Sequence, residues 1–218
     1  ILIFSCGLLT GSRVPTASRL HINALSPLTG LIGSSNVGGY AGAWLRSTGI
    51  VSIVVRGRSR QPVCLYLSEA GVELRDARPY WGLDAFDAQD RIAADAGGVN
   101  VQILTIGTAG ETAARFACIV TGRDHAAGRT GLGAVMGAKM LKAVVVCKGR
   151  GKPFEMRRER IGVAVEAYVQ QIRNSPDFET FSRHGGAGYV KWADEMGIMG
   201  TRNYRQGRFD LVDQVDGR

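Results

Sequence analysis

At 218 residues, of which 45% are hydrophobic, the chain is long enough to bury a core as one domain, or as one domain and part of a second. Its 27 Lys and Arg residues outnumber 19 Asp and Glu, and the net charge of +8 favours the binding of phosphate groups of any origin. No aromatic-studded sheet motif, recognition-helix signature or zinc-finger spacing accompanies that charge, which argues against nucleic acid as the partner. No apolar run approaches the roughly 18 residues of a membrane span, so no membrane association is expected.

The four cysteines, Cys6, Cys64, Cys118 and Cys147, lie far apart and form no C-x-x-C pair. A zinc site or an iron–sulfur cluster is therefore not expected from nearby residues of this stretch. Buried free thiols are the expectation, and they favour a reducing, cytoplasmic compartment. The sequence starts without Met, inside an apolar run that lacks a signal-peptide pattern, and it is expected to be a piece of a longer protein.

In chain order, the first part of the sequence alternates short apolar runs with turns, and the last part has helical periodicity. The boundary is expected after Gly151-Lys152, which predicts a domain over 1–152 and the start of a helical domain over 153–218. This order of elements predicts an α+β fold. The expected strands are 1–4, 20–24, 51–55, 101–106 and 115–120, with a hairpin over 62–74; the expected helices are 40–47, 85–94, 155–173, 178–184 and 189–196.

Glycines gather in two segments that repeat one another. Residues 128–150 repeat residues 36–58 at a constant offset of 92, and each copy reads as glycine-rich loop, short helix, β-branched strand and basic tail. Small residues let a backbone approach another group closely, and N–H groups at a helix N-terminus suit phosphate. The repeat predicts two half-domains related by a pseudo-twofold axis, with a ligand that is itself roughly two-fold; chance similarity of two glycine-rich loops is the alternative.

The common phosphate-binding folds do not fit the second glycine-rich segment. A Rossmann unit needs a strand that runs directly into the glycines, whereas some eight residues separate Val120 from Arg129. The stretch from Gly133 to Lys139 is one residue short of a P-loop and lacks its Gly-Lys-Ser/Thr ending.

Four motifs, in this order, closely resemble the tungsten-dependent aldehyde ferredoxin oxidoreductase family: SPLTG at 26–30, SNVGGYAG at 35–42, GTAGE at 107–111 and AAGRTGLGAVMGAKMLKAVVV at 126–146. The resemblance extends over nearly the whole chain. It implies two twisted β-sheets that carry a tungsten or molybdenum ion held by two pyranopterin dithiolenes, with Mg²⁺ bridging their phosphates. This is a two-fold ligand of the kind that the repeat predicts.

Residue by residue, the resemblance implies a pterin-binding arginine at Arg19 and Mg²⁺ contacts at Asn36 and at the Ala126 carbonyl. Guanidinium groups grip phosphate bidentately and Mg²⁺ prefers hard oxygen ligands, so these residue types fit. The chain departs from the family at His125, where the family usually has arginine; either Arg123 substitutes, or the pterin is held more weakly. The full expected cofactor-binding set is Arg19, Asn36, Val37, Gly38, His125, Ala126, Gly128 and Arg129, with Asn36 and Ala126 at Mg²⁺.

The function implied by the resemblance is oxidation of aldehydes to carboxylic acids, with ferredoxin or another electron-transfer protein as acceptor. The ligands of a 4Fe-4S cluster are expected outside this chain, in the rest of the polypeptide or in partner subunits, and no catalytic residue is assigned. Aromatic-ring reduction of the benzoyl-CoA type and a non-catalytic module that binds phosphate or nucleic acid are the alternatives. Glu111 is interpreted as a cap, a pterin N–H acceptor or a solvated turn carboxylate, and His21 shows no ligand spacing.

Overall fold

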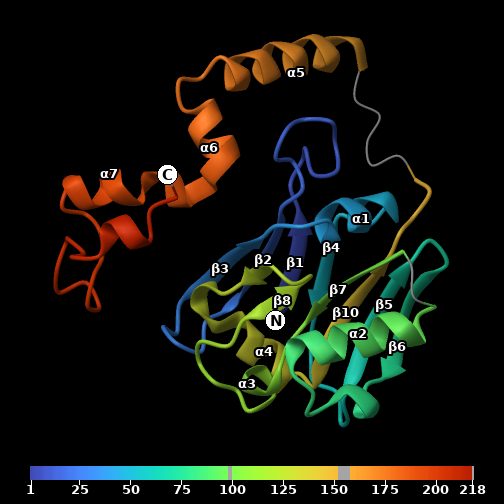
Figure 1. Ribbon diagram of the computed structural model, residues 1–218. Coiled ribbons are helices and arrows are strands. Elements are labelled where there is room, and N and C mark those ends of the chain that lie inside the picture. Colours follow the sequence, from blue (N-terminus) through green and yellow to red (C-terminus); the bar gives the residue numbers. More distant parts are fainter. Residues whose placement is uncertain (98–99, 152–157, 218) are drawn as a thin grey trace. The chain divides into compact units, whose positions relative to one another are not determined.

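The computed structural model describes residues 1–97, 100–151 and 158–217, and the chain divides into two compact units, Ile1–Met156 and Arg157–Arg218 (Figure 1). The first unit has two β-sheets with short helices, and the second is helical, which confirms the predicted α+β class. The predicted domain boundary between residues 152 and 153 lies outside the described residues. Within the described residues, no helix is both long enough and apolar enough to cross a bilayer.

The first sheet has four strands in the order β3-β2-β1-β4, and every neighbouring pair is antiparallel. A short helix, α1 (Ala41–Ser47), connects β3 to β4. The first glycine-rich segment was expected to begin as a loop, but its first residues, Asn36 and Val37, end a strand paired with β2. The strands are β1 (Leu2–Cys6), β2 (Leu20–Leu25), β3 (Ile32–Val37) and β4 (Ser52–Val55).

The second sheet has six strands in the order β6-β5-β10-β7-β8-β9. The pairing of β5 with β10 is parallel, and the other neighbours are antiparallel. The predicted strand over 115–120 starts later than expected, because Ala113 has a positive φ of 58° and Ala117 closes a turn onto the Ala114 carbonyl. The strands are β5 (Val63–Ser68), β6 (Gly71–Asp76), β7 (Val101–Thr105), β8 (Ile119–Thr121), β9 (His125–Ala127) and β10 (Leu141–Cys147).

The other regular elements of both units are helices. The Asp84 side chain caps α2 by accepting hydrogen bonds from the N–H groups of Phe86 and Asp87. The first three residues of the predicted helix over 155–173 lie outside the described residues, and the rest of it is helical. The helices are η1 (Arg78–Tyr80), α2 (Ala85–Asp95), α3 (Thr108–Glu111), η2 (Arg129–Gly131), α4 (Leu132–Ala138), α5 (Arg158–Arg173), α6 (Phe178–His184), η3 (Gly185–Tyr189), α7 (Val190–Glu195) and η4 (Val212–Gln214).

The two sheets contain two copies of one topology. In chain order the copies are β1-β2-β3-α1-β4 and β7-β8-β9-α4-β10, and their strands pair in the equivalent orders β3-β2-β1-β4 and β9-β8-β7-β10. The repeat is therefore larger than the glycine-rich segments, since it also includes β1, β2 and most of β3 before the first segment, and β7, β8 and β9 before the second. The hairpin of β5 and β6 lies between the copies in sequence and extends the second sheet beyond β10.

Two apolar cores hold the first unit together. The larger core lies between the sheets, and a smaller one lies between the second sheet and α2, as the alternation of side chains along each strand requires. Ile92 of α2 is fully buried in the smaller core, as its position in the helix predicts. Representative members of the larger core are Leu2, Phe4, Leu20, Ile22, Leu104, Val144 and Val146.

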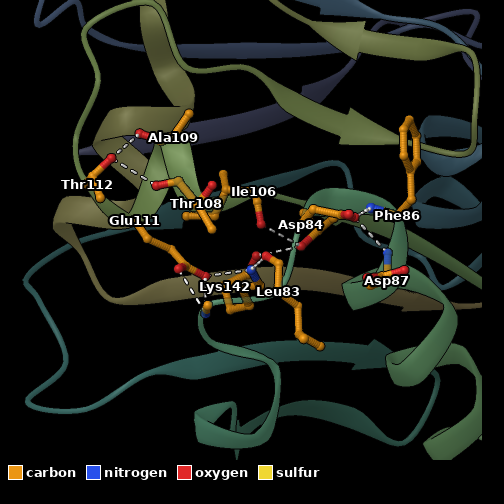
Figure 2. Close-up of polar contacts among 12 residues, drawn as sticks. Leu83, Asp84, Phe86, Asp87, Ile106, Thr108, Ala109, Glu111, Thr112 and Lys142 are labelled. Carbon is orange, nitrogen blue, oxygen red and sulfur yellow. Dashed lines mark hydrogen bonds and ion pairs between the residues drawn. The ribbon is translucent and has the colours of Figure 1, made fainter.

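A buried ion pair joins β10 to the GTAGE segment. Figure 2 shows the Lys142 ammonium donating to Glu111, at 2.5 Å, and to the Leu83 carbonyl, at 2.9 Å. Both side chains are buried, with 0% of Lys142 and 6% of Glu111 exposed. Glu111 also accepts the N–H of Gly82. The interpretation of Glu111 as a solvated turn carboxylate is therefore wrong, because its carboxylate forms an ion pair and a hydrogen bond inside the fold.

Glu111→Ala is expected to destabilise the fold strongly, because it leaves a buried ammonium with the Leu83 carbonyl as acceptor but without its counter-charge. Breaking a buried pair in this way costs about 3–5 kcal/mol in the free energy of unfolding, whereas replacing both partners by apolar residues (Glu111→Leu with Lys142→Met) should recover most of it. Denaturant unfolding measures both effects. Glu73→Ala, which breaks an exposed ion pair with Arg75, is the control and should cost less than about 1 kcal/mol. Equal small losses in the two single variants would contradict this role.

Candidate cofactor site

The outer face of the first sheet carries the predicted residues of the first copy. Leu20 and Val37 are opposite each other and buried, so the next pair, His21 opposite Asn36, points away from the core. Continuing the alternation one residue past each strand places Arg19 and Gly38 on this same outer face. Arg19 and Asn36 are exposed.

The second copy presents an equivalent face at β8 and β9. Ile119 and Ala127 are opposite each other and buried, and the neighbouring pair is Val120 opposite Ala126. By this register Ala126 occupies the strand position that Asn36 occupies in the first copy, so the strands are equivalent at an offset of 90 and not at the 92 expected for the glycine-rich segments. Ala126 is exposed, as are Gly128 and Arg129, which follow β9.

The two faces meet where β3 contacts β9 and η2. The N–H of Arg129 donates to Ser35 Oγ at 3.2 Å, and Ser26 Oγ donates to the Thr130 carbonyl at 2.8 Å. Gly33 makes this approach possible, because a Cβ there would lie 2.5 Å from Thr130 Oγ1. Two serines and one glycine of the first copy therefore fix the backbone of the second copy's candidate site.

His125 is the second point at which the copies touch. Its imidazole lies against Gly38, so closely that a Cβ on Gly38 would overlap it. His125 Nδ1 is 2.7 Å from Asp124 Oδ1. Val37 precedes Gly38 and is buried, so its side chain belongs to the core and only its backbone faces the candidate site.

Arg123, which could substitute for the family's arginine, is paired with α2 in this structure. Its guanidinium donates to both carboxylate oxygens of Asp90, at 2.7 and 2.6 Å, and it stands 5.1 Å from the ring centroid of Phe86. These partners belong to α2. The Arg123 guanidinium, which could compensate for His125, is therefore paired with a carboxylate of α2.

Most glycines of the second glycine-rich segment approach the chain's own backbone. A Cβ on Gly131 would overlap the Arg115 carbonyl, and one on Gly137 would overlap the Gly110 carbonyl. The N–H of Gly133, at the start of α4, donates to the Ala117 carbonyl at 2.9 Å. The expectation that the N–H groups of this helix face a phosphate is thus wrong for Gly133, whereas Gly128 is exposed and free of such packing.

The four cysteines are free. Burial raises the pKa of the Cys64 thiol to about 12 and that of Cys6 to about 11, which makes both poor nucleophiles. Cys118 is exposed and so contradicts the expectation of buried thiols. Among residues 1–97, 100–151 and 158–217, no group of three or more His, Cys, Asp or Glu side chains is arranged to hold a metal ion.

Sequence reasoning missed His21, which lies in the middle of the candidate site. Its Nδ1 is 2.5 Å from Asn36 Oδ1, and its Nε2 is 2.8 Å from Ser34 Oγ. The contact is formed across two paired strands, so no fixed spacing in the sequence predicts it. Only the register of β2 against β3 brings these three side chains together.

Residues 1–148 match the family model described as aldehyde ferredoxin oxidoreductase, N-terminal domain. The chain therefore belongs to the aldehyde ferredoxin oxidoreductase family. Tungsten-containing aldehyde ferredoxin oxidoreductases of Pyrococcus horikoshii and Pyrococcus furiosus are 38% and 36% identical to it, over 99% of this chain and 36% of theirs. The chain thus spans about a third of the length of these relatives.

The chain is also similar to two proteins whose names give other activities. A P. furiosus protein named aliphatic sulfonate oxidoreductase, WOR-like subunit, is 31% identical over 94% of this chain and 34% of its own length. The solved active-site complex BamBC of benzoyl coenzyme A reductase, with 1,5-dienoyl-CoA, superposes with a TM-score of 0.71 and 32% identity, over 90% of this chain and 27% of that one.

Gly137→Ala is expected to lower stability, since the added methyl group would run into the Gly110 carbonyl between α4 and α3. Overpacking of this kind costs about 1–3 kcal/mol. Gly162→Ala in α5 is the matched control, because a Cβ there meets nothing within 4 Å and alanine favours helix by about 1 kcal/mol. Thermal unfolding of both variants checks the difference; a Gly137→Ala protein as stable as the parent would show that the glycine is there for another reason.

Proposed function

We propose that this chain is the cofactor-binding part of a tungsten or molybdenum bis-pyranopterin oxidoreductase that oxidises aldehydes to carboxylic acids. Ferredoxin or another electron-transfer protein is the proposed acceptor. The observation that supports this most is the meeting of the two repeat copies at Gly38 and His125, which brings exposed residues of both copies to one surface. Tungsten and ferredoxin are named in the relatives that match almost the whole chain.

The residues at this junction fit such a cofactor. Arg19 and Arg129 are exposed cations, one in each copy, and suit two phosphates. Asn36 and the Ala126 carbonyl occupy equivalent strand positions and supply the hard oxygen atoms that Mg²⁺ prefers. The Cβ side of Gly38 is taken by the His125 imidazole, and a Cβ on Gly128 would lie 3.2 Å from Cys118 Sγ, so these glycines are proposed to offer main-chain groups to the cofactor.

In the proposed mechanism the pterin-bound metal supplies the two-electron redox chemistry, and the residues of this chain bind and orient it. The two arginines hold the phosphates, and the β3–β9 junction fixes the distance between the two halves. The aldehyde pocket and the ligands of a 4Fe-4S cluster are proposed to lie in the rest of the polypeptide or in partner subunits. The proposed compartment is the cytoplasm.

Reduction of an aromatic-ring CoA thioester is the second candidate, because the benzoyl coenzyme A reductase complex is similar in both fold and sequence. This candidate keeps the same cofactor platform and changes the substrate pocket. A non-catalytic module that binds phosphate or nucleic acid is disfavoured, since the chain belongs to a family of named oxidoreductases.

Metal and pterin analysis of the intact protein tests the proposal. We expect tungsten or molybdenum at about one atom per polypeptide, pterin released on denaturation, and Mg²⁺ that stays with the pterin. A protein purified without either heavy metal and without pterin would refute the proposal.

Substrate assays separate the two candidate reactions. With an artificial one-electron partner, the intact protein is expected to oxidise aldehydes and to leave aromatic CoA thioesters unchanged. Turnover of the thioesters alone would establish the second candidate, and turnover of neither substrate class would count against both.

Arg129→Ala is expected to lower cofactor content more than stability. It removes a charge-assisted hydrogen bond to phosphate worth about 1.5–3 kcal/mol, and the exposed guanidinium contributes little to the fold. Metal content and melting temperature are measured together. Arg58→Ala, which removes another exposed arginine, should leave both unchanged. Full metal content in the Arg129→Ala protein would remove this residue from the site.

A further inference from the structure

His21 links two polar side chains on the outer face of the first sheet, those of Asn36 and Ser34. Nδ1 meets Asn36 Oδ1 at 2.5 Å, and Nε2 meets Ser34 Oγ at 2.8 Å. Asn36 is exposed, and His21 and Ser34 are half-buried, so this network borders the surface that the proposed cofactor would cover. An exposed asparagine would otherwise sample several rotamers, and two fixed neighbours restrict it.

The hydrogen-bond partners determine where the protons lie. Asn36 Oδ1 can only accept, so His21 Nδ1 carries a proton and donates it to this bond. The Ser34 hydroxyl, which can donate or accept, meets Nε2 on the other side of the ring. With its oxygen turned toward His21, the Asn36 amide directs its two N–H donors away from the imidazole, where a ligand on the outer face can receive them.

The second copy lacks this arrangement. Where His21 pairs with Asn36 in the first copy, Val120 pairs with Ala126 in the second. An alanine has only its main-chain carbonyl to offer a cation, and a valine cannot orient a side chain by hydrogen bonding. The equivalent positions therefore share main-chain groups but differ in side-chain donors. Only the first copy has a side-chain amide that is held by His21.

We propose that His21 is a positioning residue of the cofactor site, which orients the Asn36 amide so that its N–H group donates to an anionic oxygen of the cofactor. Mg²⁺ would then be held by the main-chain oxygens of Asn36 and Ala126, because the contact with His21 turns Asn36 Oδ1 toward the imidazole. This inference rests on the proposed function. It makes the Asn36 side chain a hydrogen-bond donor to the cofactor and not a metal ligand.

Three substitutions of His21 in the intact protein test the inference. His21→Asn puts an amide N–H at the place of Nδ1, His21→Gln puts it near Nε2, and His21→Val introduces the residue that the second copy has at the equivalent position. We expect His21→Val and His21→Gln to lose pterin about tenfold faster during dialysis, equivalent to about 1.4 kcal/mol. His21→Asn should retain pterin like the parent. Asn23→Ala, on the same strand and face, is the control, and all four should melt close to the parent temperature.

Asn36→Asp distinguishes the two tasks of the side chain. A carboxylate still accepts from His21 but has no N–H to donate, so faster pterin loss is expected. Equal or higher Mg²⁺ and pterin retention in Asn36→Asp would make the side-chain oxygen a metal ligand and overturn the inference. Parent-like pterin retention in His21→Val would also overturn it while leaving the proposed function intact. A parent protein that carries no pterin would instead refute the proposed function and this inference with it.

Discussion

The close contact between β3 and the backbone that follows β9 is the constraint on which the candidate site depends. Ser35 and Ser26 hydrogen-bond the Arg129 N–H and the Thr130 carbonyl, and Gly33 leaves room for the Thr130 side chain. These bonds join main-chain atoms of one repeat copy to side chains of the other. They fix the separation of the two copies, and they use neither the guanidinium groups nor the Asn36 and Ala126 oxygens that are proposed to contact the cofactor.

The two copies have the same topology but different side chains at equivalent positions. Both run through three antiparallel strands, a short helix and a strand that returns beside the first. Asn36 with His21 in one copy corresponds to Ala126 with Val120 in the other. A platform of this kind can hold a roughly two-fold ligand and still distinguish its two ends, because main-chain contacts are shared whereas side-chain contacts are not.

The sequence predicted the α+β class and the repeat of helix and strand, and two residues of the expected set, Gly38 and His125, lie against each other. It could not predict that β3 and β9 are strands, since the glycine and serines of β3 and the alanines of β9 have low strand propensity and pair only because partner strands lie beside them. Glu111 and His21 were misjudged for a similar reason. Their partners, Lys142 and Asn36, become neighbours through sheet register and helix packing, and neither relationship leaves a regular spacing in the chain.

The most direct measurement is a crystal structure of the intact, metal-loaded protein with anomalous data collected at the tungsten absorption edge. The account predicts tungsten above the outer faces at the β3–β9 junction, with one phosphate near Arg19, the other near Arg129, and a single cation between the main-chain oxygens of Asn36 and Ala126. An anomalous peak elsewhere in the protein, with these residues facing solvent or another polypeptide segment, would contradict it.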